Sequence, residues 1–328
     1  MKYLVLGSNS FAGACLVDHL LNEEHEVIGI SRSKQPYSTL LAYAENPKLN
    51  QFTFYSLDIN KDIDEIKKII KRDKPAYIVD LAGQGMVAES WQKPEQWYQT
   101  NIIAKVKLHD FLRHCDFLEC YVRVSTPEVY GQTEASVSEG QAFNPSTPYA
   151  VSHAAIDMSL LAFYRQYDFP VVLTRFANFY GPYQQLYRII PRTILYSLTN
   201  KRLQLHGGGT SRRAFIYGED VARGIDAAIK QGKRGETYHF SSGEVISIAD
   251  LVRKICQLTK VDFNEFVEIS PDRPGKDALY SMDITKTQKE LAWSPQVNLD
   301  QGIKKTIEWV RSNVDAMETL PLEYIHKA

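Results

Sequence analysis

Short apolar runs alternate with longer amphipathic stretches through the first half of the chain. The apolar runs include KYLVL, EVIGI, FTFYS, AYIVDLA, CYVRVS and PVVLTR, which have the length of buried strands. Between them lie stretches with helical periodicity, most clearly at residues 11–22, 62–72, 95–115 and 148–166. Strands that alternate with helices form a parallel sheet, because each parallel connection needs a crossover. The sequence therefore predicts an α/β fold with a doubly wound parallel sheet, which binds ligands at the carboxyl ends of its strands.

The alternation becomes irregular after Gly181. Helical patterns continue at about residues 189–199, 219–230, 247–259 and 299–313. No repeat or flexible linker separates this part of the sequence from the first. We expect a larger domain of residues 1–180 plus about 213–235, and a smaller C-terminal lobe, the substrate lobe, of about 181–212 and 236–328.

The composition excludes several classes of partner. A chain of 328 residues, 44% of them hydrophobic, can bury a sizeable core. Its formal net charge of -1 gives no basic excess for nucleic acid, and no apolar run approaches the roughly 20 residues of a membrane span. The four cysteines and the histidines show no metal-ligand spacing, so we expect a cytoplasmic protein without a metal site.

The segment GSNSFAG, residues 7–13, lies between the first strand and the first helix. At such a turn, backbone N–H groups and the positive end of the helix can bind a dinucleotide pyrophosphate. Gly7 permits the tight turn and Gly13 allows close packing of the helix, while Ser10 stands where this spacing usually has its middle glycine. Followed by a second strand, the segment predicts a dinucleotide-binding (Rossmann) domain.

The end of the second strand, GISRSK, bears on the choice of cofactor. An NAD site usually has an acidic side chain here for the ribose 2′-hydroxyl, but Ser31 holds this position, and Arg32 could bind a 2′-phosphate. A solvated loop of charges is the alternative interpretation. We expect NADP or NAD, with NADP favoured, and place Asp58 near the adenine. The other cofactor contacts that we expect are Phe11, Ile59, Leu81, Ala82, Gly83, Tyr149 and His153.

Two further segments carry groups that could perform chemistry. VRVSTPEVYG ends a strand with Ser125, Thr126 and Glu128 at the carboxyl edge of the sheet. In PSTPYAVSHAA, a threonine cap and a proline at the first helical position place Tyr149 and His153 four residues apart on one helical face. A hydroxyl, a carboxylate and a phenol could therefore converge on one sugar carbinol.

The chain resembles the extended short-chain dehydrogenases/reductases of the nucleotide-sugar epimerase/dehydratase family. The resemblance covers nearly the whole length through GSNSFAG, DLAGQGMVAES, STPEVYG, PSTPYAVSHAA, RFANFYGPYQ, RRAFIYGED and DRPGKDALYSMDITKTQKELAWSP. It implies a nucleotide-diphospho-hexose substrate and a homodimer formed through two long helices, here residues 95–115 and 148–166.

The resemblance also implies roles for individual residues. Tyr149 would deprotonate O4 of the sugar while hydride leaves C4, Thr126 would orient that oxygen, and Glu128 would remove the proton from C5. Guanidinium groups bind phosphate bidentately, although any one arginine could instead form a surface salt bridge. Substrate contacts are expected at Ser125, Thr126, Asn178, Arg188, Arg213 and Arg273.

Two positions depart from the family pattern. His153 replaces the lysine of the Tyr-x-x-x-Lys motif, and Pro127 replaces the aspartate that often acts as the acid in dehydratases. A histidine with a pKa near 6.5 is mostly neutral at pH 7, so we expect proton transfer by Tyr149 to be impaired but possible, with a pH profile displaced upward. The other interpretation of His153 is a helix-surface residue in a protein that has lost catalysis and still binds a nucleotide.

The residues favour a nucleotide-hexose 4,6-dehydratase with a tightly bound nicotinamide cofactor. Glu128 supports this reaction, in which C4 is oxidised, water is eliminated across C5 and C6, and hydride returns to C6. Pro127 argues against it unless Glu128 passes the C5 proton to the leaving hydroxyl or a water does so. The alternative is a 4-epimerase or a 4-keto-6-deoxysugar reductase, which needs only the Thr126 and Tyr149 pair and the cofactor. A cofactor-binding pseudoenzyme is the alternative of another class.

Overall fold

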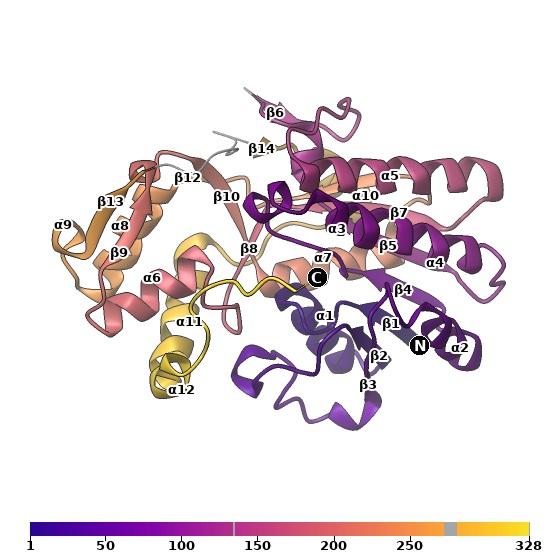
Figure 1. Cartoon of the computed structure of the whole chain (residues 1–328), viewed down its shortest axis with the longest axis horizontal. Coiled ribbons are helices and arrows are strands. Elements are labelled where there is room, and N and C mark those ends of the chain that lie inside the picture. The colour runs from indigo at the N-terminus through magenta and orange to yellow at the C-terminus, as the bar shows by residue number, and fades with distance from the viewer. Residues whose placement is uncertain (134, 272–280, 328) are drawn as a thin grey trace.

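The computed structural model describes residues 1–133, 135–271 and 281–327. At its centre lies a seven-stranded parallel sheet in the order β11-β7-β5-β4-β1-β2-β3 (Figure 1). Its strands are β1 (Lys2–Leu6), β2 (Glu26–Ser31), β3 (Phe52–Ser56), β4 (Tyr77–Asp80), β5 (Cys120–Ser125), β7 (Val171–Phe176) and β11 (Thr237–Phe240). The strand order reverses between β1 and β4, which opens a crevice at the carboxyl ends of these two strands. The predicted doubly wound parallel sheet is confirmed.

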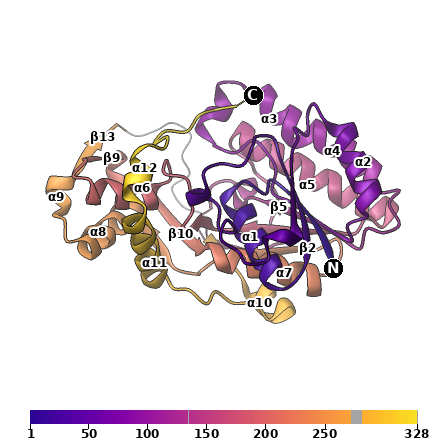
Figure 2. The same ribbon diagram turned by 90° about the horizontal axis from the view of Figure 1, so that it is seen from below.

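Helices cover both faces of this sheet (Figure 2). One face packs against α1 (Phe11–Asn22), α7 (Gly218–Gln231) and α10 (Thr285–Leu291). The other packs against α2 (Ile63–Asp73), α4 (Ala104–Leu112) and α5 (Pro148–Tyr167). Successive strand residues point to opposite faces, so in β1 Val5 joins the first core and Leu4 the second.

The single helix expected at residues 95–115 is interrupted. The chain forms α3 (Pro94–Tyr98), one π-helical turn (Gln99–Ile103) and then α4, which ends at Leu112. A π turn widens the helix by one residue and changes the direction of the side chains that follow. The predicted helix is therefore present, with one π turn inside it, and it ends three residues earlier than expected.

A smaller lobe stands beside the carboxyl edge of the sheet (Figure 1). Its core is built by α6 (Ile189–Leu198), α8 (Ile248–Thr259), α11 (Leu299–Ser312) and the strand pair β9 (Leu203–His206) and β13 (Val267–Ser270). A three-stranded sheet contains β8 (Asn178–Tyr180), β10 (Arg212–Tyr217) and β12 (Val245–Ser247). Shorter elements are β6 (Ser136–Val137), α9 (Phe263–Phe266), β14 (Ser281–Met282) and α12 (Val314–Glu318), together with 3-10 turns at 38–40, 49–51, 88–91, 127–130 and 207–209.

The two parts are interleaved further along the chain than the sequence pattern indicates. The expected boundary near residue 235 precedes β11, yet β11 pairs with β7 in the large sheet, and α10 packs on the same layer. Within the described ranges, no helix combines the length and apolarity that a bilayer crossing would require.

Candidate active site

The turn after β1 approaches the end of β4 closely. Gly7 has a φ of +86°, and a Cβ placed there would lie 2.8 Å from the Ala82 amide nitrogen. A Cβ at Gly13 would lie 2.2 Å from the Gly7 carbonyl oxygen. Ser10 caps α1: its hydroxyl donates to the Gly7 carbonyl at 2.7 Å and accepts from the Gly13 amide at 3.1 Å. Both glycines are needed for close packing, and the serine stabilises the start of the helix.

A cavity of about 1190 Å³ extends from this turn along the strand ends to the lobe. It brings together most of the residues expected at the site. The expected residues that line it are Ser10, Phe11, Arg32, Leu81, Ala82, Gly83, Ser125, Thr126, Glu128, Tyr149, His153, Asn178, Arg188 and Arg213.

Five expected residues are placed elsewhere. Gly7 and Gly13 form the turn under the cavity wall, and Ser31 accepts a hydrogen bond from the Asn9 amide at 3.0 Å behind that turn. Asp58 accepts from the Asn60 amide at 2.8 Å, and neither it nor Ile59 borders the cavity. Arg273 lies outside the described residues.

The start of α5 is built as its sequence predicts. The Thr147 hydroxyl accepts from the Ala150 amide at 3.1 Å, and Pro148 occupies the first turn. Tyr149 and His153 therefore lie on one face, with ring centroids 4.5 Å apart. Both border the cavity, as expected from their spacing.

Tyr149 is a neutral phenol at neutral pH in this environment. Burial raises the pKa of Tyr149 to about 12, and the Glu128 carboxylate acts in the same direction. A hydrogen bond with Thr126 and the positive charges of Arg123 and Arg188 oppose this rise in pKa. Deprotonation of Tyr149 therefore requires additional positive charge in the cavity.

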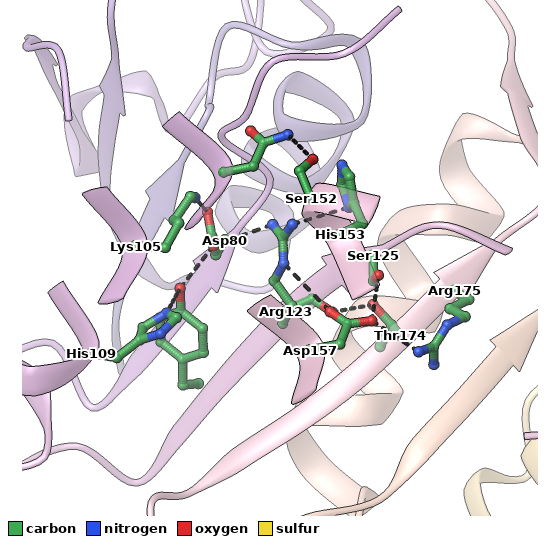
Figure 3. Close-up of polar contacts among 12 residues, drawn as sticks. Asp80, Lys105, His109, Arg123, Ser125, Ser152, His153, Asp157, Thr174 and Arg175 are labelled. Carbon is green, nitrogen blue, oxygen red and sulfur yellow. Dashed lines mark hydrogen bonds and ion pairs between the residues drawn. The ribbon is translucent and has the colours of Figure 1, made fainter. Parts of the chain in front are cut away.

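A cluster of charged side chains lies beneath His153 (Figure 3). This buried charge cluster consists of Asp80, Lys105, Arg123, Asp157 and Arg175, each at most 1% exposed. Asp80 pairs with Lys105 and with Arg123 Nη1, the latter at 3.3 Å, and Asp157 pairs with Arg175 Nη2 at 2.8 Å. Arg123 Nε lies 4.0 Å from Asp157 Oδ1 and links the two pairs. None of these five positions was singled out from the sequence.

The cluster contacts the cavity through two residues. The Ser125 hydroxyl donates to Asp157 Oδ2 at 2.6 Å, so its proton points inward and not toward a ligand. His153 Nδ1 lies 3.1 Å from Arg123 Nη2. Burial, reinforced by the charge of Arg123, holds the pKa of His153 well below its ordinary value.

The π turn before α4 places Asn101 under one wall of the cavity. Its side chain accepts from the Gln84 amide at 2.8 Å and donates to the Ser152 hydroxyl at 2.9 Å. Residues 83–89, which line the cavity, are thereby attached to α5. No pattern in QTNII distinguishes this asparagine from a surface residue.

Residues 321–327, the C-terminal strap, cross from the lobe to the sheet (Figures 1 and 2). Arg192 of α6 binds the Leu322 carbonyl and pairs with Glu323 at 3.1 Å. At the other end, the Lys327 carbonyl accepts from Gln84 Nε2 at 2.7 Å and from Arg32 Nη1 at 3.0 Å. Between these ends, the ring of His326 stacks on Trp97, with centroids 5.2 Å apart. No motif in the sequence marks this segment as part of the site.

Comparison with known proteins agrees with this arrangement. The family model for GDP-mannose 4,6-dehydratases matches residues 4–306. The chain belongs to this family of nucleotide-sugar dehydratases and epimerases. This family member is 31% identical to the dTDP-glucose 4,6-dehydratase of Shigella flexneri, in an alignment that covers 98% of the chain and 95% of the relative. The resemblance inferred from the motifs is confirmed.

Two solved structures of the family are similar over nearly their full length. A dTDP-glucose 4,6-dehydratase from Streptomyces venezuelae, solved with NAD bound, superposes with a TM-score of 0.88 at 28% identity, covering 96% of this chain and 98% of that one. A UDP-glucose 4-epimerase from Thermotoga maritima, solved with UDP-glucose, gives 0.86 at 26% identity, covering 96% and 100%. Because a dehydratase and an epimerase both share the fold, the fold alone does not decide the reaction.

Proposed function

We propose that this family member is a nucleotide-hexose 4,6-dehydratase that depends on a nicotinamide cofactor. The observation that carries the proposal is the convergence of Thr126, Glu128 and Tyr149 on the cavity that begins at the glycine turn. The relatives named as dTDP-glucose 4,6-dehydratases support it, because they align with nearly the whole chain. The tight glycine turn also fits the cofactor, because a side chain at Gly7 or Gly13 would collide with backbone there.

The chain supplies the proton transfers. The bound nicotinamide would accept hydride from C4 and return it to C6. The positive charge of the bound cofactor would add to those of Arg123 and Arg188 and favour the phenolate of Tyr149, which takes the proton from O4 while Thr126 holds that oxygen. Glu128 takes the C5 proton once the 4-keto group has made it acidic. Because Pro127 cannot donate a proton, Glu128 then passes its proton to the departing C6 hydroxyl, which leaves as water. C5 takes up a proton from solvent as hydride returns to C6, and Tyr149 releases to solvent the proton that it took from O4.

The lobe and the loop after β7 supply the groups for the nucleoside diphosphate. Asn178, Arg188 and Arg213 line the cavity, and Arg188 and Arg213 come from the segments that build the lobe. Guanidinium groups there suit the diphosphate because they bind its oxygens bidentately. Arg273 keeps the same expected role, although it lies outside the described residues.

Mass spectrometry of the protein incubated with a panel of nucleotide-hexoses tests the reaction. We expect one substrate to lose the mass of one water. Binding without any product would contradict the proposal and favour the pseudoenzyme.

A 4-epimerase or 4-keto-6-deoxysugar reductase is the second candidate. Pro127 favours it, because only the Thr126 and Tyr149 pair and the cofactor would be required. In the same experiment, an epimerase gives an isomer of unchanged mass. A reductase instead consumes added reduced cofactor with a 4-keto substrate.

Replacement of Glu128 by glutamine separates the two halves of the reaction. Glu128→Gln should lower water loss by at least about 100-fold, because the base at C5 is removed. Oxidation at C4 should persist and shift to lower pH, since Glu128 contributes to the raised pKa of Tyr149. Both steps can be followed by mass spectrometry and by the absorbance of reduced nicotinamide in single turnovers. An unchanged dehydration rate would contradict the role of Glu128.

NADP is our proposal for the cofactor in preference to NAD. Arg32 lines the cavity, and Lys327 Nζ donates to the Ser33 hydroxyl at 2.8 Å beside it, so two cations lie at the end of β2. A 2′-phosphate would be attracted to them. Arg32→Ala should weaken NADP binding at least about tenfold and change NAD binding little. Release of NAD alone from the denatured protein would contradict this preference.

A homodimer is also part of the proposal. Large apolar side chains are exposed on α3, the π turn and α5, including Tyr98, Ile103 and Met158, and these elements pack side by side. A second copy of the chain would cover them. We expect light scattering to give a dimer for the wild type and a monomer for Met158→Glu. The control Ile269→Glu, at an exposed residue on β13, should remain dimeric. A monomeric wild type would contradict the proposal.

We propose the cytoplasm as the location. All four cysteines are free thiols, which fits a reducing compartment.

A further inference from the structure

The contact between Arg123 and His153 determines which ring nitrogen of the histidine carries the proton. A guanidinium group has only donors, so His153 Nδ1, 3.1 Å from Arg123 Nη2, must accept this hydrogen bond. A neutral imidazole whose Nδ1 accepts has its proton on Nε2. We propose that Arg123 fixes His153 as the neutral Nε2–H tautomer and itself carries the positive charge that the family's lysine would place beside Tyr149.

Arg123 is held so that it keeps both its charge and its orientation. It comes from the centre of the sheet and contacts Asp80 on β4 and Asp157 on α5. Although burial by itself favours loss of the charge, the two carboxylates raise the pKa of Arg123 above its ordinary value. The planar guanidinium therefore presents a fixed donor to His153.

The buried charge cluster contains more positive than negative charge. Three cations, Lys105, Arg123 and Arg175, face two carboxylates, and protonation of either carboxylate would only increase the excess. Burial lowers the pKa of Lys105 to about 8, so it is still mostly protonated at pH 7. Tyr121 and His109 complete the partners of Asp80 as neutral groups, because the tyrosine hydroxyl donates to the carboxylate and accepts from the histidine. The excess positive charge lies directly beneath the Tyr149 and His153 face of α5.

His153 connects the buried charge cluster with the cavity. Its second ring nitrogen lies on the side of the ring away from Arg123 (Figure 3). His153 borders the cavity beside Tyr149, so an Nε2–H there can donate to a ligand hydroxyl. A second proton on His153 would place two cations in direct contact, which disfavours the imidazolium. The two tasks of a lysine, charge and hydrogen bond, are thus divided between Arg123 as a positioning residue and His153 as the donor.

The titratable and charged groups around Arg123 and His153 come from five elements. They are Asp80, Lys105, Arg175, Asp157, Tyr149 and Glu128. Glu128 is the negative charge that opposes deprotonation of Tyr149, and Arg123 and Arg188 are the charges that favour it. We therefore expect a pH profile governed by Tyr149, with no step from titration of His153 near its ordinary pKa of about 6.5.

Nuclear magnetic resonance of the holoprotein with ¹⁵N-labelled histidine tests the tautomer directly. The signals of His153, assigned by their loss in His153→Gln, should show the Nε2–H pattern unchanged from about pH 6 to about pH 8.5. An Nδ1–H tautomer, or an imidazolium that titrates in this range, would overturn the proposal. This measurement needs no substrate, so it stands even if the proposed dehydratase function fails.

A charge exchange tests the division of tasks and rests on the proposed function. His153→Lys alone brings an ammonium against Arg123 and should slow C4 oxidation at least about tenfold. The double variant Arg123→Gln/His153→Lys keeps one cation at the site and should recover at least about tenfold over Arg123→Gln. An active His153→Lys protein, or a double variant no better than Arg123→Gln, would overturn the proposal.

Arg175→Gln is the matched control for loss of a buried cation. It removes a charge from the same cluster without touching His153, so the His153 tautomer should be unchanged. If Arg123→Gln does not fold, the wild-type spectrum and His153→Lys still decide the question. A water-loss product together with an Nδ1–H tautomer would overturn only the present inference. An Nε2–H tautomer in a protein that gives no water-loss product would overturn only the dehydratase proposal.

Discussion

Tyr149→Phe is expected to lower turnover of the nucleotide-hexose by about 10²- to 10⁴-fold, with little change in nucleotide binding. The phenyl ring can keep its contact with His153, at a centroid distance of 4.5 Å, so the site should keep its shape. What is lost is the oxygen that Thr126 orients and that takes the proton from the sugar. The loss should therefore fall on kcat and leave the dissociation constant of the substrate almost unchanged.

Tyr130→Phe is a suitable control for this experiment. Tyr130 is also a buried phenol near the end of β5, but its hydroxyl pairs with His239 Nε2 at 2.8 Å, away from the cavity lining. Its replacement should lower stability by about 1 kcal/mol and leave turnover close to the wild-type value. If Tyr149→Phe kept more than a tenth of the wild-type kcat, another group would have to be the base.

Acidification from pH 7 to pH 5 is expected to lower the free energy of unfolding by about 4 kcal/mol through His109 and His239, about 2 kcal/mol for each, and His153 acts in the same direction. His109, His153 and His239 are buried as neutral groups. Burial lowers the pKa of His109 and of His239 to about 3, and holds that of His153 well below its ordinary value. In the unfolded chain each titrates near pH 6.5, so below that pH the unfolded state binds more protons and is favoured.

Denaturant unfolding between pH 5 and pH 8 measures this effect. His109→Gln should reduce this loss of stability by about 2 kcal/mol, because one of the histidines buried as a neutral group is removed. His114→Gln, at an exposed histidine on the same segment, should leave it unchanged. Carboxylates change the free energy of unfolding mainly below about pH 4, which is outside the range of this measurement. Equal stability at pH 5 and pH 7 would show that the buried histidines are protonated in the folded state.

Much of the sheet could be predicted from the sequence because buried parallel strands are continuous apolar runs. Runs such as KYLVL and PVVLTR are too apolar to lie on the surface, so a folded chain buries them in the centre of a sheet. β9 and β13 were missed, because Glu268 and Ile269 are both exposed in β13, and the alternation of Leu203 and Leu205 in the four residues of β9 is too short to indicate a strand. The π turn could not be predicted either, because it depends on contacts of Asn101 with Gln84 and Ser152 that form only in the folded chain.

The lining of the site was predictable where a residue belongs to a local motif. Thr126 and Tyr149 follow from a strand end and a helix start, which are local features. Arg123 was not recognised, because in CYVRVS a lone arginine resembles a residue at the edge of a strand. Its burial depends on Asp80 and Asp157, which are distant in sequence and belong to other elements.

The C-terminal strap makes the two walls of the cavity mechanically dependent on each other. Arg192 holds it to the lobe at Glu323, while Gln84 and Arg32 hold it to the sheet at Lys327. Each of the few residues between these contacts can span at most about 3.5 Å, so the distance between the two ends of the strap can increase only a little. A hinge motion that widened the cavity would pull these contacts apart, and rebinding of the strap would draw the walls together again. We therefore expect exchange of a ligand as large as a dinucleotide to depend on how often residues 321–327 detach from Gln84 and Arg32.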